Sequence, residues 1–167
     1  MVAKKSLIFA IGLFVISVWI WGSATPALSE TINCKGEAKS VPLTMINDST
    51  GSIIGINESK GSFTCDSGEM GTEHDLLLWE QNERKELLIQ GYSILTFKDN
   101  SKIIMKSKFT EIPDPKGEVQ WIFDGTSDIL RGNMRFNGIK GNASFKGRQN
   151  GYNIDMESTL TFTLPKK

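Results

Sequence analysis

Apolar and polar side chains alternate along most of the chain after residue 29, and this period of two predicts β-strands with one buried face. The C-terminal segment shows it best, because its polar positions between Asn153 and Thr163 fall on the opposite parity. With Ser158 as the one interruption, the apolar parity holds Tyr152, Ile154, Met156, Leu160, Phe162 and Leu164. A helix would scatter these residues around its circumference, so we expect a strand.

Shorter segments follow the same rule. Three sets each share one parity and predict further inward faces: Val119, Trp121 and Phe123; Leu130, Met134 and Phe136; Ala143 and Phe145. Clusters of Gly, Pro, Asn, Asp and Ser predict the turns between strands. These clusters are residues 57–60, 66–68, 98–101, 113–117, 124–126 and 149–151, the last containing Asn-Gly, which is typical of a two-residue hairpin.

Residues 73–90 have the composition of a helix, but their apolar residues gather in two groups. Leu76–Trp79 and Leu87–Ile89 are separated by seven residues without an apolar side chain. A helix would interleave them. We expect two strands joined by a polar turn, and a short helix stays the alternative.

The pattern therefore predicts about eight short antiparallel strands in one all-β domain. We expect a β-barrel, because closure removes the exposed strand edges that invite aggregation. A β-sandwich is the alternative.

The first 29 residues read as a cleavable signal peptide. Lys4 and Lys5 precede an uncharged apolar run from Leu7 to Gly22, which is shorter than the roughly 20 residues of a spanning helix. Small residues at Ala27 and Ser29 place the expected cleavage before Glu30. The mature domain is then 30–167, secreted or periplasmic, and does not span a membrane.

Export gives the two cysteines a meaning. In an oxidising compartment two cysteines of a small domain usually pair. We therefore expect a disulfide between Cys34 and Cys65.

A glycine-rich segment from Gly132 to Gly147 resembles a motif of small secreted β-barrels. Its core has an Arg-Phe pair, Arg135 and Phe136, one further residue, and then Gly138-Ile139-Lys140-Gly141. Barrels of the allene oxide cyclase and dirigent type are similar in this segment. The resemblance implies a barrel fold; because Asn133 and Met134 replace the expected Thr-Gly and no pocket residues of those enzymes have counterparts, it does not carry their activity over.

Composition and motifs point away from several functions. The net charge is zero, and no base-stacking motif is present, so we expect no nucleic-acid partner. His74, the only histidine, lies between two carboxylates but has no second histidine or reactive cysteine for catalysis. Asp124 and Asp128 flank a glycine without a calcium-loop pattern, so we predict no metal and no cofactor.

Two sets of side chains are candidates for binding. From Ile129 to Gln149 the chain has no acidic residue, and its basic residues predict an outer face for an anionic surface or partner: Arg131, Arg135, Lys140, Lys146 and Arg148. An ordinary solvated face is the competing interpretation. The candidate lumen-lining aromatics are Trp121, Phe123, Phe136, Phe145, Tyr152 and Phe162.

These observations favour a non-enzymatic exported barrel that binds a small apolar ligand or an envelope or extracellular partner. A cyclase- or isomerase-like enzyme acting in the lumen, with His74 and a nearby glutamate, is one alternative. A structural envelope protein is another. The sequence leaves open the ligand, the oligomeric state, and whether the lumen is filled or hollow.

Overall fold

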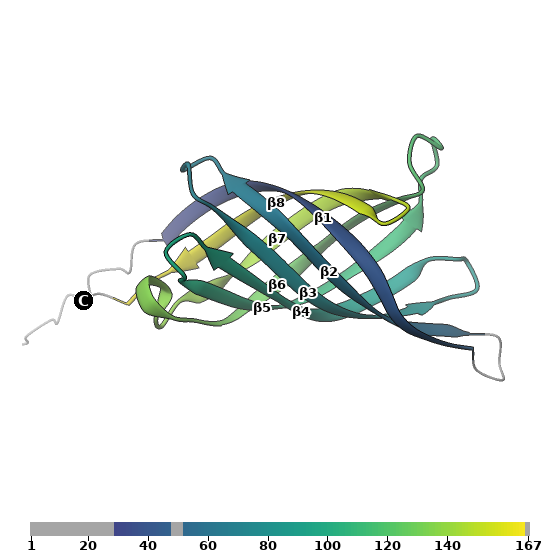
Figure 1. The fold of residues 1–167 in the computed structure, drawn as a ribbon, viewed down its shortest axis with the longest axis horizontal. Coiled ribbons are helices and arrows are strands. Elements are labelled where there is room, and N and C mark those ends of the chain that lie inside the picture. Colours follow the sequence, from purple (N-terminus) through teal and green to yellow (C-terminus); the bar gives the residue numbers. More distant parts are fainter. Residues whose placement is uncertain (1–28, 48–51, 166–167) are drawn as a thin grey trace, which may run out of the picture.

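The structure, a computed structural model, describes residues 29–47 and 52–165. It is a closed barrel in which each strand pairs with its sequence neighbours and β8 returns to β1, all antiparallel (Figure 1). The strands are β1 Ser29–Asn47, β2 Ile53–Cys65, β3 Met70–Gln81, β4 Leu87–Phe97, β5 Lys102–Pro113, β6 Trp121–Gly132, β7 Lys140–Asn150 and β8 Asn153–Thr163. The predicted eight-stranded all-β barrel is confirmed, and the sandwich alternative is wrong.

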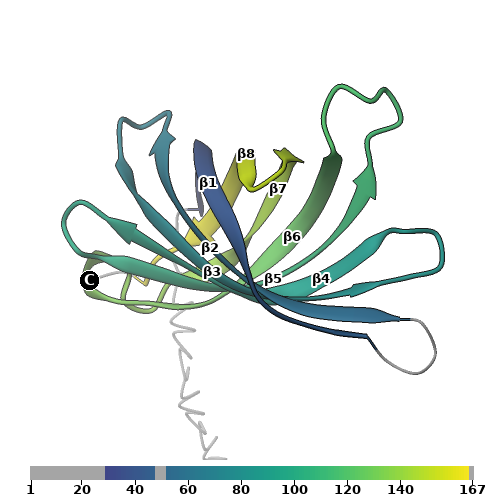
Figure 2. The same ribbon diagram turned by 45° about the vertical axis from the view of Figure 1, so that its right-hand side comes forward.

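The two ends of the barrel differ. At one end the β2–β3 and β4–β5 turns lie beside the three-residue 3₁₀ helix η1, Met134–Phe136, which joins β6 to β7; we call this the helical end. At the other end lie the β3–β4, β5–β6 and β7–β8 connections, and we call it the loop end (Figures 1 and 2). Since η1 is the one helix among the described residues, none of their helices is long enough to cross a bilayer.

The disulfide staples β1 to β2. Cys34 and Cys65 are direct cross-strand partners, and their sulfurs are bonded on the inner face. This confirms the predicted pair. A bridge that closes 31 residues contributes about 3–4 kcal/mol to stability, and its presence fits an oxidising compartment.

The helical end holds the apolar core. Phe136 of η1 packs against Phe97 and Phe162, with ring centroids 4.8 and 6.0 Å apart, and Phe63 meets Phe97 edge-on at 5.2 Å. Ile103 and Leu160, 0% and 1% exposed, fill the space below. Side chains therefore plug this end of the barrel.

Arg135 closes the same end from outside. Its guanidinium carbon lies 4.4 Å from the ring centroid of Phe136 and 4.8 Å from that of Phe97. The guanidinium also forms ion pairs with Glu69 and Asp99 and donates to Ser101 Oγ. It thus ties η1 to the β2–β3 and β4–β5 turns.

Two predicted turns are wrong, and both are strand segments with polar or glycine residues facing inward. Residues 57–60 lie within β2, where Asn57 and Ser59 point into the lumen and Glu58 and Lys60 form an outer ion pair. Residues 124–126 lie within β6, where Gly125 leaves room for Phe109; a Cβ there would overlap its neighbour. The other predicted turns, including the polar turn after β3, are present.

The inward parity predicted for Leu130 and Met134 is also wrong. Phe123, Ser127 and Ile129 are buried on one parity of β6, so Leu130 falls on the outward parity and is 50% exposed. The β5–β6 register then skips Leu130 between Ile129 and Arg131. Met134 belongs to η1 and is exposed. A bulge of this kind changes the face of every later residue, and no turn residue in the sequence marks it.

Candidate functional site

The middle of the lumen is lined by hydroxyl and carboxyl groups. Ser93, Ser107 and Ser127 lie on the adjacent strands β4, β5 and β6, and their side-chain oxygens are separated by 3.1 and 2.8 Å in a hydrogen-bonded row. The hydroxyl of Ser93 donates to the carboxylate of Asp75 on β3. The row thus crosses four strands and fixes a polar belt above the apolar core.

Two carboxyl groups on β3 share this belt. Glu73 and Asp75 are both directed into the lumen, on the same parity as Leu77 and Trp79, and hydrogen-bond to each other. Burial raises the pKa of Glu73 well above its ordinary value, and the nearby charge of Asp75 adds to this effect. Burial also raises the pKa of Asp75, to about 6. Of the two carboxyl groups, Glu73 therefore holds its proton more strongly and donates it to Asp75.

A third carboxyl group, Glu111, lies closer to the loop end. It is 5% exposed and follows Phe109 on the inward face of β5. Within the described part of the chain it forms no hydrogen bond or ion pair. Burial alone raises its pKa to about 7.

These groups surround a cavity of about 50 Å³ in the loop-end half of the lumen. Leu77, Ile89 and Met156 contribute aliphatic walls, and Phe109, Phe123 and Phe145 form an aromatic wall. A neighbouring space of about 30 Å³ extends toward the apolar core and shares Glu73 and Phe145 with it. Among the described residues, no lysine, arginine or histidine lines either space.

Two further polar atoms of the belt have no partner within the described residues. Both Ser59 Oγ and Asp75 Oδ1 are fully buried without a hydrogen bond. A buried polar atom without a partner costs about 1–3 kcal/mol. Together with Glu111, they leave unused hydrogen-bonding capacity facing the cavity.

In contrast, the polar side chains of Trp79, Asn57 and Ser40 at the rim of the cavity are hydrogen-bonded to one another. Trp79 Nε1 donates to Asn57 Oδ1 at 3.0 Å, and Asn57 Nδ2 donates to Ser40 Oγ at 3.2 Å. This chain holds the indole against the cavity wall. The fluorescence of Trp79 therefore reports on the occupancy of the cavity.

The aromatic side chains that the sequence predicts to line the lumen lie in different parts of the barrel. Phe123 and Phe145 line the cavity, whereas Phe136 and Phe162 belong to the plugged core at the helical end. Trp121 is half-buried and lines neither space. Tyr152 is 64% exposed in the β7–β8 turn, so its place in the lumen is a wrong prediction: its apolar parity continues past the end of the strand.

The five basic residues do not form one uniform positive face. Arg131 on β6 and Lys140, Lys146 and Arg148 on β7 are exposed, but Lys146 pairs with Glu157 and Arg148 with Asp155 of β8. Arg135 lies at the helical end instead. The carboxylates of β8 neutralise two of these basic side chains, and the sequence alone does not show that β8 lies beside β7. Binding to an anionic surface stays a prediction.

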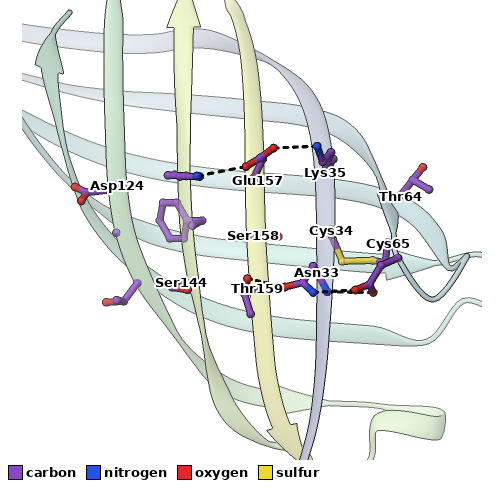
Figure 3. Close-up of a pocket in the computed structure, with 15 residues that line it drawn as sticks. Asn33, Cys34, Lys35, Thr64, Cys65, Asp124, Ser144, Glu157, Ser158 and Thr159 are labelled. Atoms are coloured by element: carbon purple, nitrogen blue, oxygen red, sulfur yellow. Dashed lines mark hydrogen bonds and ion pairs between the residues drawn. A yellow bond between two sulfur atoms is a disulfide. The ribbon is translucent and has the colours of Figure 1, made fainter. Parts of the chain in front are cut away.

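Figure 3 shows the outer wall where this pairing occurs, a broad depression that runs from β2 across β1, β8 and β7 to β6. Glu157 accepts ion pairs from both Lys35 and Lys146 at 3.0 and 3.5 Å. Asn33 donates to Asp66 and accepts a hydrogen bond from the Thr159 hydroxyl. Since these polar groups already bind one another, the depression is a weaker candidate site than the lumen.

His74 also lies outside the lumen. Its Nε2 is 2.8 Å from Glu58 Oε1 on the outer wall, where Glu58 also pairs with Lys60. The strand alternation that directs Glu73 and Asp75 inward directs His74 outward. The histidine–glutamate pair considered for an enzyme in the lumen is therefore not available there.

Asp124 and Asp128 are likewise exposed on the outside of β6. Over residues 29–47 and 52–165, no three His, Cys, Asp or Glu side chains are grouped closely enough to hold a metal ion. The expected signal peptide lies outside the described residues except for Ser29, which begins β1.

Sequence reasoning missed the acids of the site, Glu73, Asp75 and Glu111. Glu111 gave a signal, because it shares a parity with Phe109, whereas Glu73 and Asp75 share one with Trp79 that the apolar Leu76 and Leu78 on the other parity obscure. A carboxylate on an apolar parity is the feature to look for.

Compared with protein-family models, with curated proteins and with solved structures, the chain matches none of them.

Proposed function

We propose that this protein is an exported, non-enzymatic binding protein that holds a small ligand in the loop-end half of its lumen. One observation carries the proposal: a cavity walled by phenylalanine and aliphatic side chains also contains buried polar atoms that have no partner. Binding sites for small molecules typically combine apolar walls with a few polar groups that orient the ligand.

The size of the cavity limits the ligand. About 50 Å³ accommodates a few water molecules, because one water needs on the order of 10–15 Å³ by this measure. A ligand with a short apolar body therefore enters by displacing water and turning side chains at the rim. Drug-sized ligands require several hundred Å³.

The site favours binding over catalysis. The carboxyl groups of the lumen have no imidazole, thiol or lysine beside them, because the lining of both spaces contains none. The serine row is hydrogen-bonded to itself and to Asp75. These groups orient a ligand more readily than they attack one.

Export is the second part of the proposal. The basic start, the apolar run and the small residues before Glu30 support a cleaved signal peptide, and the Cys34–Cys65 bridge supports an oxidising compartment. The ligand is then met in the periplasm or outside the cell.

The test uses the tryptophans of the mature protein, Trp79 and Trp121. The protein starting at Glu30 is titrated with primary alcohols and amines of four to eight carbons, indole and benzene derivatives, while its fluorescence is recorded. We expect a saturable change with at least one of them. The Trp121→Phe variant, which keeps the cavity indole, retains the change, and Trp79→Phe loses it.

The proposal is contradicted if no member of the panel gives a saturable signal. It is also contradicted if Trp79→Phe and Trp121→Phe respond alike, since only Trp79 lines the cavity.

A further inference from the structure

We infer that the lumen binds a small organic cation, an amine or ammonium group on a short apolar body, with the carboxylate of Glu111 as its counter-charge. This inference rests on the proposed function and names the chemical class of its ligand.

The first argument is the sign of the charges around the cavity. The titratable groups that face it are Glu73 and Asp75 from β3 and Glu111 from β5. The lining residues of β1, β2, β4, β6, β7 and β8 contribute no titratable group. An anionic ligand would find no positive charge in this lining, whereas a cation would meet an uncompensated negative one.

The second argument is that, of the three carboxyl groups facing the cavity, Glu111 is the one that bonds to no other described residue. Glu73 and Asp75 hydrogen-bond to each other, and Asp75 also accepts from Ser93. Glu111, nine-tenths buried and directed into the cavity, has no hydrogen bond or ion pair among the described residues. Leaving a carboxylate in this state is costly, and an ammonium N–H would supply the missing bond.

The third argument is the aromatic wall beside Glu111. Phe109, two residues away on the same inward face, lies with its ring centroid 5.6 Å from Phe123 and 5.3 Å from Phe145. The faces of such rings attract cations, and their edges pack against an alkyl chain. A carboxylate next to several rings is the combination that recognises ammonium groups.

An organic cation fits better than a bare metal ion. A divalent metal needs several oxygen, nitrogen or sulfur ligands around one point, and the part of the chain that the structure describes has no group of three acidic, histidine or cysteine side chains that could supply them. The mostly apolar walls would also leave a metal ion poorly solvated. An alkyl group is instead stabilised by apolar contacts with those walls.

The experiment compares n-hexylammonium with 1-hexanol, which has the same chain length and no charge. Binding is measured by Trp79 fluorescence in the Trp121→Phe background at pH 8, where Glu111 is ionised and the amine is still a cation. We expect hexylammonium to bind about tenfold more tightly, since a charge-assisted hydrogen bond is roughly twice as strong as a neutral one.

Glu111→Gln removes the charge and keeps the size of the side chain. We expect it to abolish the preference for the amine while hexanol still binds, which also demonstrates that the variant is folded. Glu37→Gln, an exposed carboxylate on the outer wall of β1, is the matched control and keeps the preference. In the unsubstituted lumen, the preference should decline as the pH falls from 8 to 5.

Two results would overturn the inference and leave the proposed function standing: hexanol binding as tightly as hexylammonium, or Glu111→Gln retaining the full preference. A preference for the amine that does not change between pH 8 and 5 would equally overturn the role of Glu111. If neither compound binds saturably, the proposed function fails as well.

Discussion

Glu111 makes the stability of this barrel depend on pH in a direction opposite to that of most surface carboxylates. Burial raises the pKa of Glu111 from its ordinary value of 4.5 to about 7 in the folded state. The folded protein therefore favours the protonated form. The contribution of Glu111 to stability is complete below pH 4.5 and is lost as the pH rises through 7.

The size of this change in stability follows from the difference between the ordinary pKa of Glu111 and its pKa in the folded protein. One pKa unit corresponds to about 1.4 kcal/mol, so ionising Glu111 in place lowers the free energy of unfolding by about 3 kcal/mol between pH 4.5 and 8. In Glu111→Gln the side chain does not titrate. Relative to the unsubstituted protein, the variant should gain about 3 kcal/mol more at pH 8 than at pH 4.5.

Urea unfolding at both pH values, followed by tryptophan fluorescence, measures this difference. Any cost of the new amide itself is present at both pH values and cancels. Glu37→Gln, which replaces an exposed carboxylate, should give nearly the same change at pH 4.5 and 8. If the gain of Glu111→Gln is equal at the two pH values, or larger at pH 4.5, the buried, unpartnered carboxyl group described above is refuted.

Three further predictions concern stability. Replacing both Cys34 and Cys65 by alanine should lower the free energy of unfolding by about 3–4 kcal/mol; denaturant unfolding measures it, and a native protein that reacts with thiol reagents would contradict the bridge. Arg135→Ala should cost about 1–2 kcal/mol, since it removes two ring contacts and two ion pairs; a thermal melt unchanged from the parent would refute this. Gly125→Ala should cost about 1–3 kcal/mol, because its Cβ would overlap Phe109, and an unchanged urea midpoint would show that β6 can move away.

The sequence was sufficient to predict the strands, because alternation persists wherever one face of a strand is apolar. The closure of the barrel followed from the need to avoid exposed strand edges, and the disulfide followed from the expected export. The prediction failed where the lumen itself is polar. Asn57 and Ser59 look like a turn until the neighbouring strands are known to bring hydroxyls and carboxyls beside them. Leu130 shows a second limit, since it was grouped with Met134 and Phe136 across a bulge that is set by the pairing of β5 with β6 and not by a local residue.

For the candidate site, the aromatic part could be predicted from the sequence, and Glu73 and Asp75 could not. Phe123 and Phe145 follow their strand periods into the lumen. On β3 the pattern is obscured, because Leu76 and Leu78 are apolar but face outward and are more than 40% exposed. With apolar residues on both faces, the sequence does not show which parity is inner, and Glu73 and Asp75 are taken for solvent-exposed acids.

The apolar core at the helical end, with Arg135 stacked on the rings of Phe97 and Phe136, closes that end of the barrel. Among the described residues, the β3–β4, β5–β6 and β7–β8 connections border the opposite end of the lumen, which leaves that end as the route to the cavity. Residence time is therefore governed by how often the side chains at that end rearrange. A substitution that changes only this barrier alters the rates of uptake and release by the same factor and leaves the equilibrium affinity unchanged.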